Sequence, residues 1–383
     1  MGKYHSMDRR RFLKITSGTI GVVGLAPLSL SGFQEMAEAD TAPSEIKYRT
    51  LGRTGLKYTP LGFGAMRTSD PALIRQGVDM GINNIDTARG YMGGENERIV
   101  GEAIAGVRDQ VHITTKIQHG SQVRMESDLN ESLRALDTAH IDILLRHGMS
   151  SISDLGEEET REFLTKAKES GKARFVGFST HRNMADLLRA AADDGLYDVV
   201  LAAYNFKHDD DMTEAVNYAA DKGIGVIAMK TQAGGYDAAS TAALNPHQAA
   251  LRWVFSNENV TSAIPSMVTY QQLEENFGAM RKTFGFLDKK TLHRYGNAID
   301  DKLCRMCDDC SGMCPHGVNV ADLNRCVMYV DGYGDSDLGH STYRELSASE
   351  NADRCRDCDE CVVQCTNGVN VAANMRRATE IFA

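Results

Sequence analysis

Four polar residues lie at or just beyond the ends of three consecutive apolar runs of the chain, and their types could together reduce a carbonyl group. Asp86 lies in the run that begins at residue 83 and Tyr91 follows that run, Lys116 lies at the end of the next run and His147 ends the one after. A group that transfers hydride to a carbonyl needs a proton donor for the developing alkoxide. Tyrosine, whose ordinary pKa is about 10, becomes such a donor when a cation and a dry site tune it. Taken singly, these residues also fit a structural ion pair between Asp86 and Lys116 and a core histidine.

The elements that would position these residues repeat regularly along the chain. Apolar, β-branched-rich runs are separated by amphipathic helical stretches, two of which span 127–136 and 156–171. Strands that alternate with helices predict a parallel sheet. The eight predicted strands are 61–66, 83–88, 111–117, 141–147, 174–180, 199–205, 225–230 and 262–267.

Eight such units fit an α/β fold of the (β/α)8 TIM barrel class. An open doubly wound sheet would show the same periodicity, but no Gly-x-Gly-x-x-Gly follows an early strand. In a barrel, the polar residues at the strand ends would surround one mouth. Those residues are Asp86, Lys116, His147, Ser179, Asn205, Lys230 and Ser266.

From residue 48 to about residue 276, the sequence resembles the aldo/keto reductase superfamily. The resemblance implies that Tyr91 is the general acid, that Lys116 lowers its pKa and that Asp86 keeps Lys116 charged. It also implies that His147 orients the carbonyl through a hydrogen bond. The corresponding reaction is hydride transfer between a nicotinamide cofactor and a carbonyl or alcohol substrate, which could be sugar-like.

The resemblance also implies a set of cofactor-binding positions, and several of them depart from the family pattern. Thr180 stands in place of Asn, Leu201 in place of Gln and Met229 in place of a ring-stacking Tyr. Ser266 and Gln272 occupy positions where Lys and Arg often bind the 2′-phosphate of NADPH, so the choice between NAD and NADP stays open. The full set is Gly64, Met66, Ser179, Thr180, Met229, Lys230, Ser266, Met267, Gln272, Glu275 and Asn276.

The last hundred residues contain a duplicated cysteine motif. Segments 304–325 and 355–376 are identical at 12 of 22 positions, and each contains Cys-x2-Cys-x2-Cys-x3-Cys. This is the bacterial ferredoxin spacing, in which the fourth cysteine of each motif binds the cluster of the other motif. We therefore expect two [4Fe–4S] clusters, one on Cys304, Cys307, Cys310 and Cys365, and the other on Cys355, Cys358, Cys361 and Cys314.

Two other interpretations of the eight cysteines remain open. They could bind two zinc ions, although zinc ribbons normally use paired Cys-x2-Cys motifs. In an oxidising compartment they could form disulfides. Cys326 has no place in either set of four and is expected to be a small buried hydrophobe. The spacing between the motifs also indicates an insertion at about 331–351.

The N-terminus resembles a Tat export signal. Three arginines at 9–11 precede Phe-Leu-Lys and a moderately apolar stretch to residue 33, and Ala37-Glu38-Ala39 offers a cleavage site. We expect a signal peptide over 1–39, a linker over 40–46, the barrel over 47–285 and a small, mostly helical, ferredoxin-like domain over 286–383. The protein would then be periplasmic, or held at the outer face of the cytoplasmic membrane if the signal is not cleaved.

The composition and net charge of the chain limit the classes of partner that it could bind. The chain of 383 residues is 42% hydrophobic and 25% charged, as in ordinary globular proteins, and its net charge is −10. Such an acidic chain should not bind nucleic acid, and no run after the signal is long enough to span a membrane. We expect a small carbonyl or alcohol substrate and clusters that are structural or serve an external one-electron partner. The alternative is an electron-transfer or assembly subunit with a non-catalytic barrel.

In the family, long C-terminal loops form the back of the substrate pocket. Here the cysteine-containing segment occupies that part of the chain. The resemblance therefore predicts that this segment forms a wall of the pocket.

Overall fold

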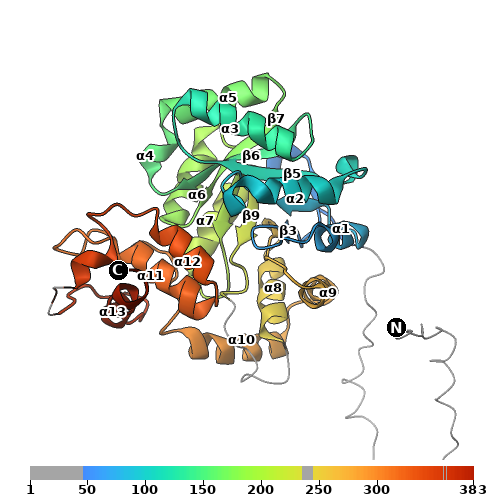
Figure 1. Ribbon diagram of the computed structural model, residues 1–383. Coiled ribbons are helices and arrows are strands. Elements are labelled where there is room, and N and C mark those ends of the chain that lie inside the picture. Colours follow the sequence, from blue (N-terminus) through green and yellow to red (C-terminus); the bar gives the residue numbers. More distant parts are fainter. Residues whose placement is uncertain (1–45, 235–244, 357, 359) are drawn as a thin grey trace, which may run out of the picture. The chain divides into compact units, whose positions relative to one another are not determined.

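The computed structural model describes residues 46–234 and 245–383, with the exception of 357 and 359. The described residues all belong to one compact unit (Figure 1). The expected signal peptide lies outside the described residues, and the predicted domain boundaries stay predictions. Among the described residues, no helix has the length and apolar character needed to cross a membrane.

A parallel sheet of eight strands forms the centre of this unit, in the order in which the strands follow one another along the chain. Parallel bridges between Leu61 and Ala263 and between Gly64 and Ser266 join its two edges, so the sheet curls into a barrel. Each strand overlaps one of the predicted runs. They are β3 (Phe63–Gly64), β4 (Asn84–Asp86), β5 (His112–Ile117), β6 (Ile141–Met149), β7 (Ala173–Thr180), β8 (Val199–Ala203), β9 (Gly225–Met229) and β10 (Val260–Ala263).

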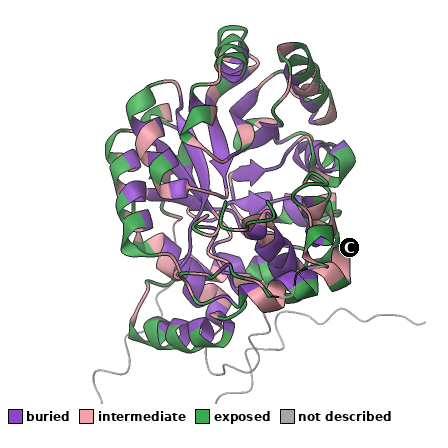
Figure 2. Ribbon diagram, turned by 90° about the vertical axis from the view of Figure 1, so that its left-hand side faces the viewer, coloured by how far each residue is buried: buried purple, intermediate pink, exposed green. Residues whose placement is uncertain are grey.

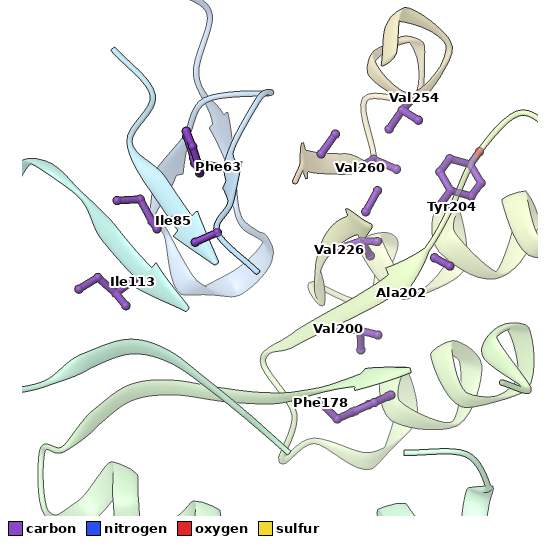
Figure 3. Packing of buried hydrophobic residues seen from close by; sticks show 14 of the residues in the cluster. Phe63, Ile85, Ile113, Phe178, Val200, Ala202, Tyr204, Val226, Val254 and Val260 are labelled. Atoms are coloured by element: carbon purple, nitrogen blue, oxygen red, sulfur yellow. The ribbon is translucent and has the colours of Figure 1, made fainter. Parts of the chain in front are cut away.

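Alternation along the strands creates two apolar layers. On β8, Val200 and Ala202 belong to the large core between the sheet and the helices, whereas Val199 and Leu201 belong to a smaller core inside the barrel. Figure 3 shows side chains of the larger core on successive strands, and Figure 2 shows the buried strands inside a more exposed layer of helices. Because successive side chains in a strand point to opposite faces, one run of apolar residues supplies both layers.

Helices follow the strands and cover the sheet. The predicted helices at 127–136 and 156–171 correspond to α3 and α5. The helices of this part are α1 (Pro71–Asp79), α2 (Glu95–Ile104), α3 (Gln122–Ala135), α4 (Ile152–Leu155), α5 (Glu158–Glu169), α6 (Met184–Asp194), α7 (Asp210–Asp221), α8 (Pro246–Ser256) and α9 (Tyr270–Ala279).

A short hairpin closes one end of the barrel. Strands β1 (Arg49–Thr50) and β2 (Lys57–Tyr58) pair antiparallel. Leu51, Leu56 and Tyr58 of this hairpin pack against the interior core of the barrel. The end formed by the carboxyl termini of the strands is therefore the one left for a site.

Beyond α10 (Phe286–Ile299), the described residues are helical or irregular. Helices α11 (Val320–Val327), α12 (Ser336–Tyr343) and α13 (Val371–Phe382) lie together in Figure 1. The duplication is visible in the structure, because Asn319 and Asn370, one repeat apart, cap α11 and α13 in the same way. Asn374 also donates a hydrogen bond to Asn324, which links the two copies.

Candidate active site and cysteine sites

The four residues predicted to form the reaction centre lie together at the barrel mouth. Lys116 is 1% exposed, and its Nζ donates to Asp86 Oδ1 at 2.6 Å and to the Thr87 carbonyl at 2.7 Å. The same ammonium lies 4.8 Å from the centre of the Tyr91 ring. The rings of Tyr91 and His147 meet edge to face at 5.8 Å.

Neighbouring strands bring these side chains together. Asp86 ends β4, Lys116 lies near the end of β5 and His147 lies near the end of β6. Tyr91 comes from the loop after β4, where it begins a short 3-10 turn (Tyr91–Gly94). Gly94 ends this turn with a φ of 98°, in the left-handed region that favours glycine.

The surroundings set the charge of each group. Burial lowers the pKa of Lys116, but Asp86 and Tyr91 outweigh this effect and the pKa is raised, so the ammonium stays charged. Burial raises the pKa of Tyr91, and the opposing effect of Lys116 is smaller. The lowering of the tyrosine pKa that the resemblance implied is therefore present but does not prevail, and Tyr91 holds its proton.

His147 is held neutral. Burial, together with the charges of Lys116, Arg146 and Arg325, lowers its pKa to about 3. The Gln118 side-chain amide donates to His147 Nδ1 at 3.2 Å, which leaves the ring proton on Nε2. A neutral ring with a proton on Nε2 can donate a hydrogen bond to a carbonyl oxygen.

Two buried side chains of α2 position the reaction centre, and the sequence analysis did not identify them. The Glu97 carboxylate accepts from Thr115 at 2.6 Å and from Arg89 at 2.7 Å, which ties the strand of Lys116 to the loop of Tyr91. Asn96 donates to the Ala65 carbonyl and accepts from Thr87. The available signal was two polar residues on the otherwise apolar face of a helix that follows the tyrosine.

A cavity of about 1010 Å³ opens in front of the tetrad. Tyr91 and His147 line it, together with charged residues from the loops after the other strands. Its remaining wall comes from the cysteine-containing segment, as predicted. The lining residues of that segment are Asp322, Arg325, Tyr329, Asp335, Asp337, Leu338, Ser341, Thr342, Arg344, Glu345 and Leu346.

The predicted cofactor positions fall into two groups around this cavity. Met66 and Lys230 line it directly. The Gly64 amide, at the end of β3, donates a hydrogen bond to the Pro265 carbonyl, and Gly64 forms a parallel bridge with Ser266. Ser266 therefore lies beside Gly64. Met229 ends β9 immediately before Lys230. These residues lie on the strands that flank the mouth.

The side chains of the other predicted positions have protein partners. Ser179 accepts from the Gly148 amide, and Thr180 donates to the Arg182 carbonyl. Gln272 accepts from the Val268 amide. The Glu275 carboxylate accepts hydrogen bonds from the side-chain amides of Asn245 and Gln271, and the Asn276 side-chain oxygen accepts one from Gln232. Met267 is fully buried.

Leu201, at the position of the family glutamine, lies in the barrel interior. It therefore contributes packing rather than a polar contact. In contrast, the Thr231 hydroxyl is buried without a hydrogen-bond partner directly after Lys230. A polar ligand at this loop would satisfy it.

The first predicted set of four cysteines lines a single cavity. Cys304, Cys307, Cys310 and Cys365 all border it. Burial raises the pKa of Cys304 to about 12, and the nearby thiols of Cys310, Cys307 and Cys365 raise it as well. Met306 and Asp308, with φ of 60° and 73°, turn the backbone on either side of Cys307.

The four cysteines of the second predicted set also lie near one another. Burial raises the pKa of Cys355 to about 11, with further contributions from Cys314, Cys361 and Cys358. None of the nine cysteines forms a disulfide, and Cys326 is fully buried, as expected for a small hydrophobe. The chain thus pairs three cysteines of one repeat with the fourth cysteine of the other, in both directions.

Four cysteine thiols are the ligand type that a [4Fe–4S] cluster uses. Among the described residues, no group of three or more His, Cys, Asp or Glu side chains is arranged to hold one metal ion. In a [4Fe–4S] cubane each thiolate binds a different iron, so its sulfurs stand apart by the width of the cluster. Four thiols spread around one cavity have the chemistry that this cluster requires.

Comparison with known proteins supports one family. The model of the aldo/keto reductase family matches residues 60–240. The chain is 27% identical over 296 residues to L-galactose dehydrogenase of Arabidopsis thaliana, covering 65% of this chain and 93% of that protein. It is 29% identical over 247 residues to methylglyoxal reductase DkgB of Escherichia coli O157:H7, covering 60% and 90%.

Solved structures show the same fold. An aldo-keto reductase from Klebsiella pneumoniae, solved in complex with NADPH, matches with a TM-score of 0.56 at 24% identity, over 66% of this chain and 95% of that one. The holo form of an aldo-keto reductase from Bacillus halodurans also matches with a TM-score of 0.56, at 22% identity, over 65% and 96%.

The family match and the relatives named as a dehydrogenase and a reductase show an oxidoreductase of the aldo/keto reductase type. The family model and the relatives support the aldo/keto reductase superfamily for this chain. The cysteine motifs lie beyond residue 240, where the family match ends.

Proposed function

We propose that the protein transfers hydride between NAD(P)(H) and a carbonyl or alcohol substrate, and that its C-terminal segment carries two [4Fe–4S] clusters. The observation that supports the reaction best is the contact of charged Lys116 with both Asp86 and Tyr91, beside a neutral His147 and in front of a large cavity. Relatives that are named as reductases and dehydrogenases agree with it.

In this reaction Tyr91 donates its proton to the carbonyl oxygen, and His147 holds that oxygen with its Nε2 proton. A bound nicotinamide would supply the hydride. Lys116 stabilises the phenolate that Tyr91 becomes, because its ammonium lies 4.8 Å from the ring. Asp86 keeps this ammonium charged in a site that excludes water.

Met66 and Lys230, which line the cavity, support cofactor binding there, and the buried, unpartnered hydroxyl of Thr231 follows directly after Lys230. NADPH is bound in a solved relative of the same fold, which favours a nicotinamide here as well. The choice between NAD and NADP is part of the test below.

The export prediction adds a constraint. We propose that the Tat-like N-terminus directs the folded protein to the periplasm, where free NAD(P)H is not expected. Tight retention of the nicotinamide would then let the enzyme oxidise one alcohol and reduce another carbonyl. The two clusters would be inserted in the cytoplasm before export, and they would be structural or would serve an external one-electron partner.

Substitution of the proton donor tests the catalytic proposal. Tyr91→Phe should lower kcat for carbonyl reduction by about 100-fold or more, since general acid catalysis contributes factors of about 10² to 10⁴. Tyr48→Phe, at a tyrosine that is 53% exposed, is the matched control and should retain full activity. Full activity of Tyr91→Phe would contradict the assignment and favour a non-catalytic barrel.

The resident cofactor can be measured directly. The folded, exported protein is purified without added nucleotide and denatured, and the supernatant is assayed for NAD(H) and NADP(H). About one nicotinamide per chain is expected from tight retention. If no nicotinamide is released, tight retention is contradicted. The remaining explanations are then a cofactor that binds only transiently or chemistry at the clusters.

A further inference from the structure

Basic residues outnumber acidic ones in the lining of the cavity, where the acidic residues are Asp322, Asp335, Asp337 and Glu345. Six lysine and arginine residues line it, from both the barrel and the cysteine-containing segment. Several are neutralised by partners, as Arg67 is by Asp335 at 2.8 Å. The six are Arg67, Arg146, Arg182, Lys230, Arg325 and Arg344.

Arg325 lies near two carboxylates of the cavity, Asp322 and Glu345. It lies on α11, its side chain is 15% exposed, and it pairs with Asp322 at 2.8 Å. That carboxylate is shared, because Arg182 also pairs with it at 2.8 Å. The Nε of Arg325 is buried without a hydrogen-bond partner, so one donor of this guanidinium is unsatisfied.

Lys230 is the second of these cations. Its Nζ lies 4.4 Å from the ring centre of Tyr329 and 5.5 Å from that of Tyr333. Burial and the charge of Arg325 lower its pKa to about 7, against the opposing charge of Asp335. The charge of Arg325 therefore acts on Lys230, and both residues line the same cavity.

We propose that Arg325 and Lys230 together bind an oxyanion, a carboxylate or a phosphate, that belongs to the carbonyl substrate, which would give Lys230 a substrate contact in place of its predicted cofactor contact. A buried positive charge without a full complement of partners is costly, and a bound oxyanion offers both charge and hydrogen-bond acceptors. Arg325 suits this role because an arginine binds carboxylate and phosphate through several donors at once.

The position of Arg325 favours the substrate over the cofactor as the source of the anion. Its charge acts on His147, the residue that would hold the carbonyl oxygen, and both line the same cavity. It reaches the cavity from the segment that also forms the outer wall. The proposal rests on the proposed function, since it names the substrate class of the same site. The other source of the same chemistry would be a phosphate of the nicotinamide cofactor.

A matched pair of aldehydes tests the proposal with NADPH as cofactor. Succinic semialdehyde carries a carboxylate, and butyraldehyde has the same chain length without one. Arg325→Gln should lower kcat/KM by about 10- to 100-fold for succinic semialdehyde and by less than about 3-fold for butyraldehyde, as expected for the loss of a charge-assisted contact. Arg376→Gln, at an exposed arginine on α13 outside the cavity, is the charge-matched control. Equal losses for both aldehydes would overturn the proposal.

Binding separates this proposal from the proposed function. Titration calorimetry with succinate needs no turnover, and its affinity should fall about 10-fold or more in Arg325→Gln and be largely kept in Arg325→Lys. Succinate binding of this kind without any carbonyl reduction would leave the subsite in place and refute the reaction. Absence of succinate binding to the folded wild type, or an equal loss of NADPH affinity in Arg325→Gln, would overturn the subsite while the reaction could stand.

Discussion

Two hydrogen-bond partners stabilise the buried charge of Lys116. Its ammonium is almost completely enclosed, and its partners are the Asp86 carboxylate and the Thr87 carbonyl, both supplied by the preceding β-strand and its end. An ion pair in such a place costs desolvation energy, so its presence reflects function more than stability.

This balance predicts the effect of breaking the pair. Lys116→Met should cost about 3–5 kcal/mol of stability, because it leaves the Asp86 carboxyl buried without its partner. The double variant Asp86→Leu/Lys116→Met should recover most of this loss and stay inactive. Chemical denaturation and a reductase assay measure the two effects. A double variant that is no more stable than the single one would contradict the ion-pair argument.

The depressed pKa of His147 predicts a pH dependence of stability. The unfolded histidine has a pKa near 6.5 and the folded one of about 3, so the unfolded chain binds more protons between these values. Stability should therefore fall as the pH is lowered through this window, and His147→Gln should remove this part of the loss. His293→Gln, at an exposed histidine of α10, is the control. Equal acid sensitivity of wild type and His147→Gln in denaturation curves would refute the prediction.

At the scale of elements, the segment between the two cysteine motifs has a clear position. The predicted insertion at 331–351 contains α12, and residues of this helix line the catalytic cavity. An element without catalytic residues of its own therefore limits the space in front of the tetrad.

A bulky residue on α12 should change selectivity by size. Ser341 is exposed and lines the cavity, so Ser341→Trp should lower kcat/KM for long aldehydes by about 10-fold and for short ones by much less. Ser336→Trp, at the start of the same helix, leaves the cavity lining unchanged and should have little effect. A uniform loss for all chain lengths in Ser341→Trp would speak against α12 as a wall.

At the scale of the whole described unit, the cysteine site and the catalytic cavity share a wall. His181, Arg182, Asp322 and Arg325 line both cavities. Arg182 also pairs with Asp308 of the first cysteine loop at 3.5 Å. Loss of the first cluster should therefore disturb the catalytic cavity and not only the C-terminal segment.

Cysteine substitutions test this coupling. Cys304→Ala should remove about half of the iron and of the visible absorbance, since each cluster needs its own four ligands. It should also alter the ratio of kcat/KM values for the charged and uncharged aldehydes. Cys326→Ala, at a buried cysteine outside both sets, should keep the full iron content. Unchanged selectivity after loss of the first cluster would show that the shared wall does not depend on it.

Much of this arrangement could be predicted from the sequence because it depends on local patterns. Continuous apolar runs such as 199–203 indicate strands, and the polar residues at strand ends indicate the mouth. The positions of Asp86, Lys116 and His147 follow, because adjacent parallel strands end side by side. The pairing of the cysteines between the two repeats likewise follows from their spacing.

The tertiary structure alone shows which residues of distant segments share the cavity or position the reaction centre, because these roles depend on contacts between those segments. Arg325 and Lys230 are almost a hundred residues apart, and no motif marks either as a partner of the other. Glu97 resembles an ordinary helical surface residue until its helix packs against the strand of Thr115. Chain periodicity determines which elements form, whereas the packing of these elements determines which side chains share a cavity.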